Sequence, residues 1–377
     1  MNNVEPLLSD LVAIDSINPD LVTGVAGEGA IAAFISRWME AAGLEVQLDE
    51  TLPGRPSVVG IARGTGGGRT LLLNGHMDTV GVAGMSEPFR PRLENGRLYG
   101  RGAYDMKGGL AACLVAAAEA ARRQLRGDVI VAAVADEEYA GLGTLSIAGR
   151  YRADGAIVAE PTELQLVVAH KGFLWLEVET EGVAAHGSRP HLGVDAIVKM
   201  GGVLAGLDQL ADGLGRRPQH PLLGPPSIHA STISGGGEWS TYPDRCALAI
   251  ERRLLPGETG DAAEAEVRAI VDRLAAIDPA FRAVVRRVLE RVPLETGLDA
   301  ALLGVVRQAA EGVLSQPITP TGVSFWTDAA SLHNAGIPTV LFGPSGEGAH
   351  AAVEWVDVAS VRACAEVYLA TALAFCG

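Results

Sequence analysis

Short apolar runs alternate with amphipathic stretches through the first half of the chain. Residues 26–42 have helical spacing of apolar positions and end at Gly43, a common residue after a helix, and the alanine-rich stretch 108–123 also predicts a helix. Apolar or alternating runs predict strands at 44–48, 57–62, 70–74, 128–134 and 155–159. Because strands that alternate with helices form covered sheets, this half of the chain predicts an α/β layer.

The pattern changes after His170 and later returns. Strands are predicted at 171–180, 227–234, 245–253 and 281–289, with helices at 193–211 and 260–277. This β-α-β-β-α-β order is that of a ferredoxin-like unit, which can form a compact domain by itself. From about residue 296 the α/β pattern resumes, with a helix to 314, a strand at 339–343 and a helix from 357. We expect an α+β domain at 171–289 inserted into an α/β domain made of 1–170 and 290–377.

The composition allows a large core and predicts a cytoplasmic protein. The 377 residues are 48% hydrophobic and 20% charged. No stretch reaches the roughly eighteen uninterrupted apolar residues of a membrane span, and the start, MNNVEPLLSD, lacks the features of a signal peptide. The cysteines form no C-x-x-C pair and fit reduced thiols; they are Cys113, Cys246, Cys364 and Cys376.

The charge of the chain argues against one class of partner. Its formal net charge is −15 at pH 7. Binding to a phosphate backbone requires clustered Lys and Arg, so nucleic acid is not expected as a partner. Many of the acidic residues can be explained as a solvated surface, but some lie where solvation is not the obvious reason for them.

Four predicted strands of the larger domain end in residues that bind metals or move protons. TLLLNG leads into His76 and Asp78, DVIVAAVA into Asp136-Glu137-Glu138, GAIVA into Glu160, and TVLFGPSGEGA into His350. Residues i and i+2 of extended backbone point the same way, so Asp78 can lie beside His76. An isolated H-x-D is more often an ordinary turn. However, ligands of open α/β sheets collect at the carboxyl ends of strands, and four such endings favour a site there.

Asp105, in GRGAYDMKGG, is a fifth candidate. By position alone it is better explained as the N-cap of the alanine-rich helix, because Asp is a favoured capping residue. The surrounding glycines suggest backbone packed closely around something, which capping does not require; they are Gly100, Gly102, Gly108 and Gly109.

The candidate residues form a set of nitrogen and oxygen ligands without cysteine. Such a set suits zinc, cobalt or manganese in a hydrolytic site. Adjacent side chains on extended backbone diverge, so one of Glu137 and Glu138 can bind metal while the other faces an attacking water as general base. The alternative for this pair is a solvated surface.

The motifs also resemble those of a known family. They occur in one order: HMDTV at 76–80, GRGAYDMKGG at 100–109, DEE at 136–138, EPT at 160–162, AAHGSRP at 184–190, RLLPG at 253–257, and the late His350. Together they resemble the M20 family of dinuclear zinc amidohydrolases, which includes acetylornithine deacetylase, succinyl-diaminopimelate desuccinylase, aminoacylase and glutamate carboxypeptidase. The resemblance runs from about residue 5 to about residue 375 and implies a zinc-exopeptidase-like catalytic domain with a central, mostly parallel sheet, and an inserted lid and dimerisation domain.

The resemblance implies a role for each candidate ligand. His76 and Glu160 would bind one metal, Glu138 and His350 the other, and Asp105 would bridge them. The expected cofactors are two Zn²⁺ ions, with Co²⁺ or Mn²⁺ as possible substitutes.

The resemblance also implies the residues that act around the metals. Asp78 would fix the tautomer and orientation of His76. Glu137 would take a proton from the attacking water and deliver it to the leaving amine. His186, in the inserted domain, would stabilise the oxyanion and often reaches across a dimer in this family.

A substrate-binding arginine is implied as well. Arg253 matches the arginine of the family's R-x-x-P-G motif and is suited to a substrate carboxylate, with Arg252 in reserve because strand parity lets only one of them face the site. Where relatives often have N-x-x-P-D, this chain has Ser240-Thr241-Tyr242-Pro243-Asp244, so the relatives' contacts do not transfer directly. Asp328 and Trp326 lie on loops, and ordinary packing explains them as well as a pocket does.

The expected protein is a homodimeric zinc hydrolase that cleaves the amide bond of a small N-acyl amino acid, as acetylornithine deacetylase does. The alternatives are a di- or tripeptidase, a carboxypeptidase or a succinyl-diaminopimelate desuccinylase of the same family, and, more remotely, a metal-containing protein that only binds its ligand. A small N-acyl amino acid or short peptide is the expected partner, with no membrane involved.

Overall fold

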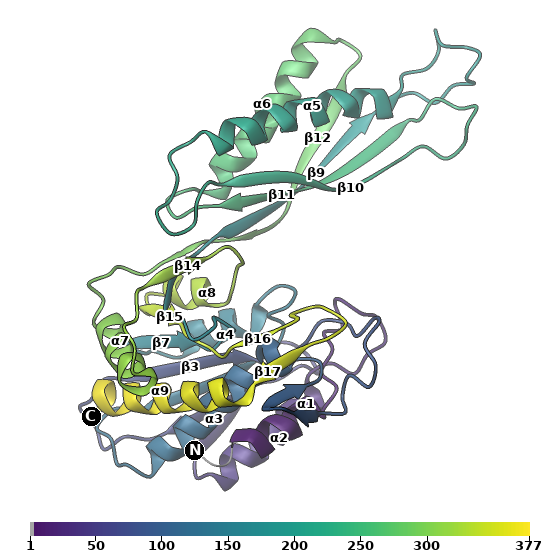
Figure 1. The fold of residues 1–377 in the computed structure, drawn as a ribbon. Coiled ribbons are helices and arrows are strands. Elements are labelled where there is room, and N and C mark those ends of the chain that lie inside the picture. The colour runs from purple at the N-terminus through teal and green to yellow at the C-terminus, as the bar shows by residue number, and fades with distance from the viewer. Residues whose placement is uncertain (1–3) are drawn as a thin grey trace. The chain divides into compact units, whose positions relative to one another are not determined.

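The structure is a computed structural model that describes residues 4–377, and these residues form two compact units (Figure 1). Unit 1 contains the described residues to Val168, Thr296–Thr321 and Thr327–Gly377; unit 2 contains Ala169–Glu295 and Gly322–Trp326. The junctions therefore differ from the predicted insert at 171–289. One reason is that the strand predicted at 281–289 continues to Arg291. Another is that Trp326 packs edge-on against Phe173, with ring centroids 5.9 Å apart.

Unit 1 is organised by a mixed sheet, which has nine strands among the described residues. The strands follow the order β1 (Glu45–Asp49), β2 (Ser57–Ala62), β6 (Val129–Val134), β3 (Leu71–His76), β7 (Gly155–Val158), β15 (Thr339–Leu341), β8 (Val167–His170) and β13 (Leu294–Glu295), with β14 (Thr321–Val323) beside β8. Of these, β13, the second half of β8 and most of β14 fall within the residue ranges of unit 2. Strands β6, β3, β7 and β15 are parallel neighbours. Their apolar residues are buried, as expected for a sheet covered on both faces. The predicted α/β class is confirmed.

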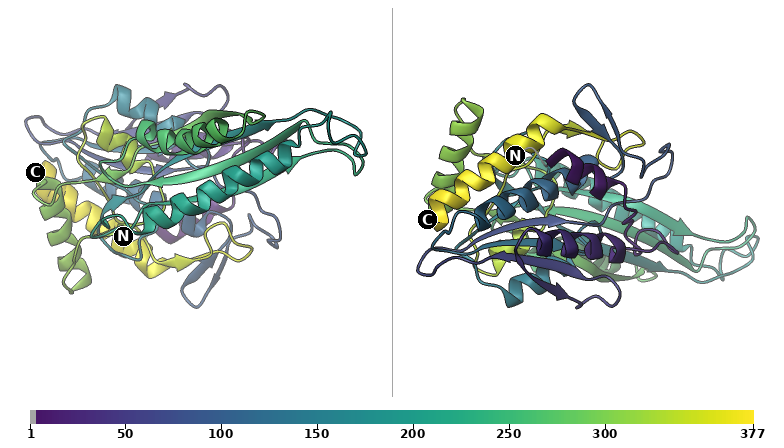
Figure 2. Two further views of the ribbon diagram at one scale, coloured as in Figure 1. Left: turned by 90° about the horizontal axis from the view of Figure 1, so that it is seen from above. Right: turned by 90° about the horizontal axis from the view of Figure 1, so that it is seen from below.

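Helices cover both faces of this sheet. One face carries α1 (Val4–Val12), α2 (Gly29–Ala41), α3 (Gly108–Ala121), α7 (Ala301–Leu314) and α9 (Val358–Cys376), which share a single hydrophobic core with the sheet. Figure 2 shows several of them side by side in its right-hand view. The shorter helices α4 (Leu142–Arg150) and α8 (Ala329–Asn334) contact the sheet from the opposite face. The sequence analysis did not predict α1, α4 or α8.

By length and composition alone, α9 could cross a membrane, with a mean hydropathy of 1.4 over its most apolar window. However, 56% of that window is buried within the protein. The helix packs against α3 and α7, as the central helix of a hydrophobic core does. Packing within unit 1 therefore accounts for its apolar surface.

A small second sheet joins two distant segments of unit 1, and the sequence analysis did not predict it. Its strands follow the order β16 (Gly346–Glu347), β17 (Trp355–Asp357), β5 (Arg97–Tyr99) and β4 (Arg92–Glu94). The guanidinium of Arg97 lies 3.9 Å from the ring centroid of Trp355, which adds a cation–π contact to the pairing of β5 with β17. This sheet holds the segment that contains His350 beside the segment that leads to Asp105.

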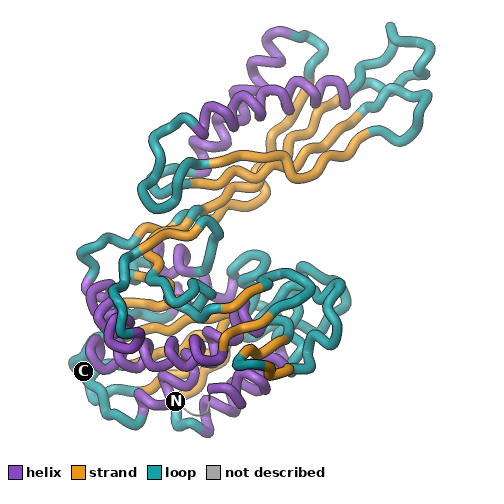
Figure 3. The backbone as a smooth tube through the Cα atoms, in the orientation of Figure 1, coloured by secondary structure: helices purple, strands orange, loops and turns teal. Residues whose placement is uncertain are grey.

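Unit 2 has the β-α-β-β-α-β order expected from the sequence. Its elements are β9 (Gly172–Glu181), α5 (Ala196–Gly215), β10 (Ser227–Gly235), β11 (Arg245–Leu254), α6 (Gly260–Ile277) and β12 (Arg282–Arg291). The strands form an antiparallel sheet in the order β10-β11-β9-β12, with both helices on one side (Figure 3). Alternate residues of β9 and β11 are buried beneath the helices.

Candidate active site

The candidate residues of unit 1 converge at the carboxyl ends of its parallel strands. His76 is the last residue of β3, Glu137 and Glu138 follow β6, and Glu160 follows β7. His350 lies in the loop between β16 and β17, with a left-handed backbone (φ 62°). Because β6, β3 and β7 are neighbouring parallel strands, the residues that follow them meet at one end of the sheet. His350 reaches the same place from its own loop, through contacts with Asp105 and Glu138.

Asp105 lies between the two histidines. Its Oδ1 is 3.2 Å from Nε2 of His76, and its Oδ2 is 3.4 Å from Nε2 of His350. His350 Nε2 is also 2.9 Å from Oε2 of Glu138. With one oxygen directed at each histidine, Asp105 could offer one oxygen to each of two cations bound by these histidines.

The potential ligand atoms form two overlapping groups. In His76, Glu137 and Glu160, and again in His76, Asp105 and Glu138, they all lie within 4.8 Å of one another. Imidazole nitrogen and carboxylate oxygen suit a divalent cation such as zinc, cobalt or manganese. The residues present therefore fit a metal centre.

Asp105 does not cap the helix that follows it. The N-cap position of α3 is occupied by Lys107, and no side chain caps that end. Asp105 itself belongs to an irregular turn, η1 (Ala103–Lys107), and has non-helical φ and ψ. At least one nearby glycine serves packing rather than a ligand, because a Cβ on Gly109 would lie 1.9 Å from the carbonyl oxygen of Ala159.

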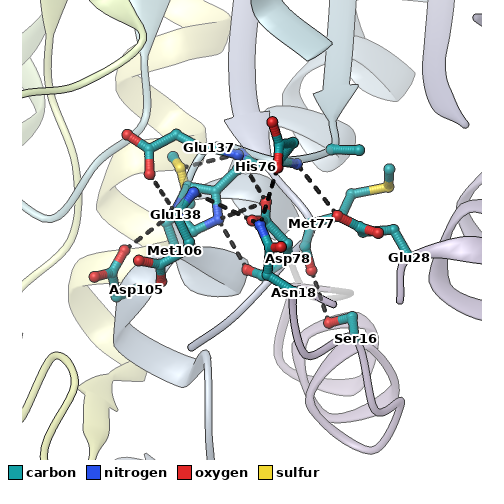
Figure 4. A network of polar contacts seen from close by, with 12 residues as sticks. Ser16, Asn18, Glu28, His76, Met77, Asp78, Asp105, Met106, Glu137 and Glu138 are labelled. Atoms are coloured by element: carbon teal, nitrogen blue, oxygen red, sulfur yellow. Dashed lines mark hydrogen bonds and ion pairs between the residues drawn. The ribbon is translucent and has the colours of Figure 1, made fainter. Parts of the chain in front are cut away.

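His76 and Asp78 interact mainly through the backbone (Figure 4). Nδ1 of His76 lies 2.9 Å from the carbonyl oxygen of Asp78 but 3.6 Å from its carboxylate. The carboxylate instead accepts the backbone N–H groups of Glu137 and Glu138, each at 3.1 Å, and the side-chain amide of Asn18 at 2.8 Å. The backbone carbonyl thus places the proton on Nδ1 and leaves Nε2 facing the cluster.

A buried polar network supports the turn before Glu137. The amide of Asn18 also donates to Asp136 at 3.3 Å, and Asp136 pairs with Arg55 at 3.0 Å. Arg55 makes two further bonds to the buried carboxylate of Glu28, which accepts the backbone N–H of Asp136. Asp136 has a left-handed backbone (φ 70°), so these contacts hold a turn that few non-glycine residues adopt.

The side chains of the cluster perturb one another's ionisation. Burial raises the pKa of Glu137, and repulsion by the carboxylate of Glu160 raises it further. Burial also raises the pKa of Glu160, where repulsion by Asp105 and Glu138 opposes the lowering effect of His76. Hydrogen bonds to Asp105 and Glu138 raise the pKa of His350 to about 10. Burial alone would lower the pKa of His76, but Asp105 and the surrounding carboxylates raise it well above its usual value. A divalent cation would therefore displace protons from this site.

Asp328 is a further acid near the site. It is 1% exposed, stands at the start of α8 and accepts the hydroxyl of Thr144 at 2.6 Å, while Asn74 donates to that hydroxyl at 2.9 Å. Its charge contributes to the raised pKa of Glu137 and Glu160. The sequence placed Asp328 only on a loop, because no apolar strand precedes it.

Comparison with known proteins shows which family the chain belongs to. Residues 72–374 match the peptidase family M20/M25/M40. The chain belongs to this family. It is 34% identical to an acetylornithine deacetylase of Myxococcus xanthus, with 98% of this chain and 97% of the relative covered. It is 31% identical to an N-formyl-4-amino-5-aminomethyl-2-methylpyrimidine deformylase of Bacillus subtilis, with 92% and 89% covered.

A solved structure shares the fold of this M20 protein. A tripeptidase from Staphylococcus aureus superposes with a TM-score of 0.81 at 20% identity, covering 100% of this chain and 98% of the other. At that identity the likeness shows the fold alone. Family membership makes the protein a metal-dependent amidohydrolase.

In unit 2 of this M20 enzyme, the loop that carries His186 is exposed and braced by its neighbours. His186 pairs with Thr241 in an isolated bridge, and the N–H of Gly187 donates to the carbonyl of Ser240 at 2.7 Å. The backbone N–H of Ser188 donates to Nδ1 of His186 at 3.2 Å. Since Nδ1 is then an acceptor, the neutral ring carries its proton on Nε2, which can donate to a ligand. The Ser240-Thr241 segment thus supports the histidine loop through its backbone.

The two adjacent arginines of β11 have opposite environments. Arg252 is fully buried and pairs with Glu258 at 2.7 Å and Glu266 at 3.4 Å. Arg253 retains 29% of its side-chain exposure and pairs with Glu251 at 2.7 Å. Because adjacent residues of a strand face opposite sides of the sheet, Arg253 is the one of the two that remains available to bind a substrate. A substrate carboxylate would compete with Glu251 for its guanidinium.

Proposed function

We propose that this M20 enzyme hydrolyses the amide bond of a small N-acyl amino acid, with Glu137 as the general base. The observation that carries the proposal is the position of Glu137, which is 11% exposed with Oε2 4.0 Å from His76 Nε2, beside the ligand cluster. Its raised pKa suits a group that must both accept and release a proton. The named activities of the two curated relatives, deacetylase and deformylase, favour a short acyl group.

We propose that the cluster holds two divalent cations, with zinc as the expected metal. His76 and Glu160 would hold one and Glu138 and His350 the other, and Asp105 would contribute to both. When bound, such ions polarise the amide carbonyl and lower the pKa of water, so that a nucleophile forms near neutral pH.

The protein's own side chains would perform the remaining steps. Glu137 accepts a proton from the attacking water and returns it to the leaving amine. Asp78 holds the peptide groups of Glu137 and Glu138 in place. The Nε2–H of His186 donates to the oxygen that gains negative charge, and Arg253 binds the carboxylate of the substrate.

Turnover of a substrate panel tests this proposal. The metal-free and the zinc-loaded protein would be compared on N-acetyl, N-formyl and N-succinyl amino acids and on dipeptides. We expect metal-dependent release of free amine from an N-acetyl or N-formyl amino acid. Cleavage only of peptides would instead identify a peptidase, and cleavage of the succinyl substrate a desuccinylase. If the protein binds metal but turns over none of these substrates, the result would support the alternative of a metal-containing protein that only binds its ligand.

We further propose that the enzyme is a homodimer that associates through unit 2. In the described part of that unit, β10 is an edge strand whose residues are exposed except for Ile228. Ile233 on this strand is 54% exposed, and the adjacent helix α5 exposes Ile197 and Val198 by 43% and 68%. A long edge with apolar neighbours is suited to pairing with the same edge of a second copy.

We place the enzyme in the cytoplasm. Its cysteines are all unpaired and buried. This state fits a reducing compartment. Measuring the distribution of the tagged protein between cytoplasmic and exported fractions tests this assignment.

A further inference from the structure

A buried carboxylate that is not one of the proposed metal ligands accepts hydrogen bonds from the backbone around Asp105. Glu354 is 2% exposed, and each of its oxygens accepts two hydrogen bonds. Its Oε1 accepts the backbone N–H groups of Tyr104 and Asp105 at 2.9 Å and 3.1 Å. Its Oε2 accepts the N–H of Gly102 at 3.0 Å and Nη1 of Arg101 at 2.7 Å. Four donors from one short segment therefore converge on a single carboxylate.

The same ion pair reaches the segment that carries His350. Arg101 is 2% exposed, and its Nη2 donates to the carbonyl oxygen of Ala351 at 2.9 Å. The backbone of Gly100 also bonds to that of Glu354, with its N–H 3.2 Å from the Glu354 carbonyl oxygen. His350 itself is 57% exposed, so its place depends on how this backbone is held.

We propose that Arg101 and Glu354 are positioning residues, which hold the segments of Asp105 and His350 at the spacing that two divalent cations require. The inference rests on the metal centre of the proposed function. Neither residue would touch metal or substrate, because both Glu354 oxygens are already engaged by Arg101 and by backbone donors. They act through the backbone next to the two ligands.

Fold stability alone is a weak reason for this pair. Burying two charges has a desolvation cost that well-packed apolar side chains avoid, so such a pair often adds little net stability. The pair does fix geometry, since a carboxylate with four donors permits one placement of residues 102–105. In Glu354→Gln, one of the two accepting oxygens becomes an NH₂ group, which cannot accept hydrogen bonds from the N–H donors that face it. Even this isosteric change should therefore loosen the turn at residues 102–105.

Metal titration of Glu354→Gln tests the proposal without depending on turnover. Metal-free protein would be titrated with Co²⁺, followed by its absorption spectrum and by the amount of bound metal. We expect one of two cations to bind about 10- to 100-fold more weakly, as is typical when a residue that orients a metal ligand is changed. If the hydrolase activity exists, saturating metal should restore kcat, whereas Glu137→Gln should stay inactive at any metal concentration.

Asp128→Asn is the matched control. Asp128 also accepts hydrogen bonds from the side chain of Arg63 and from the backbone N–H of Gly64, both at 2.8 Å. However, it precedes β6, at the opposite end of that strand from Glu137 and Glu138. The metal affinity of the Asp128→Asn variant should equal that of the wild-type protein. If Glu354→Gln unfolds, the double variant Arg101→Met, Glu354→Gln takes its place. It removes both buried charges, so no unpaired charge remains, and its metal affinity can be measured in the same titration.

The outcomes separate three cases. Weaker metal binding by a folded variant supports the positioning role, even if no amide substrate is ever found. Wild-type affinity for both cations overturns it. Lower thermal stability with unchanged metal affinity also overturns it and assigns the pair to folding alone.

Discussion

The imidazole of His76 is oriented by the backbone of Asp78, while the Asp78 carboxylate serves other residues. Nδ1 lies 2.9 Å from the carbonyl oxygen and 3.6 Å from the carboxylate. The sequence had suggested that the acid itself fixes the histidine. In the structure, the backbone carbonyl of Asp78 sets the tautomer of His76. The Asp78 carboxylate instead fixes the turn that carries Glu137 and Glu138.

Replacing Asp78 by Asn should therefore affect catalysis more than metal binding. The amide NH₂ would face N–H donors and disturb the turn before Glu137, while the carbonyl that holds His76 remains. We expect kcat to fall about 10- to 100-fold, with a smaller change in metal affinity. Steady-state kinetics and metal titration of the same preparation measure both. A loss of metal affinity larger than the loss in kcat would mean that the carboxylate acts on His76 after all.

Glu137→Gln should abolish proton transfer and leave the metal site filled. General acid–base catalysis contributes about 10²- to 10⁴-fold to rate, so kcat should fall by that factor. Bound metal, measured by elemental analysis, should equal that of the wild type. Full activity in this variant would contradict the assignment of the base.

The stability that metal adds should increase with pH. His350 has its pKa raised from 6.5 to about 10, and Glu137 and Glu160 also have raised values, so the folded metal-free protein binds more protons than the unfolded chain. Their stabilisation is complete below the unfolded pKa values and is lost as pH rises through the folded ones, whereas the lowered pKa of Asp105 opposes this trend. Metal requires deprotonated ligands.

Thermal unfolding of metal-free and metal-loaded protein checks this sign. The difference in Tm between them should widen from about pH 5.5 to about pH 8. A constant difference would show that the ligands do not exchange protons for metal. Parallel measurements with a metal-free Glu137→Gln variant would show how much of the trend belongs to that carboxyl.

The adjacent arginines should give opposite phenotypes. Arg253→Ala should raise KM about 10- to 100-fold, the value of a lost charged hydrogen bond, with little change in Tm. Arg252→Ala should instead destabilise unit 2 by up to about 3 kcal/mol, because it removes a fully buried guanidinium and leaves Arg217 as the remaining basic partner of Glu258 and Glu266. Substrate kinetics and denaturant unfolding separate the two. An unchanged KM in Arg253→Ala would remove this residue from the substrate site.

The ligand cluster could be predicted because local sequence and topology agree there. An apolar strand that ends in His76, Glu138 or Glu160 marks the carboxyl edge of a parallel sheet, where neighbouring strands bring such residues together. The α+β unit could also be predicted, since its strands alternate buried and exposed residues and its helices are long.

Residues that act through backbone hydrogen bonds could not be found this way. Glu354 is 249 positions from Asp105 in sequence, and Asn18 is 60 positions from Asp78. Their roles depend on the pairing of β5 with β17 and on the placement of the N-terminal segment, neither of which has a periodic sequence signal. The junctions of unit 2 were also displaced, because β12 continues beyond the predicted end and Trp326 packs onto β9.

The edge of β10 should control assembly. Ile233→Lys places a charge among the exposed apolar residues of β10 and α5, and we expect it to convert the proposed dimer into a monomer in light scattering. Val288→Lys is the control, because Val288 is 63% exposed on β12, the strand at the opposite edge of the same sheet. A dimer that survives Ile233→Lys but not Val288→Lys would place the interface on the other edge.

Mixing inactive variants then shows whether assembly completes the site. If His186 acts on the partner's substrate, a dimer of one His186→Ala chain and one Glu137→Ala chain has a single intact site, because the wild-type His186 of the second chain serves the wild-type Glu137 of the first. Mixtures should then regain up to about one quarter of wild-type activity, since random exchange makes half the dimers mixed and each has one of two sites. The same mixture carrying Ile233→Lys should regain none. If no activity returns while mass measurements prove exchange, His186 acts within its own chain, and the dimer serves another purpose.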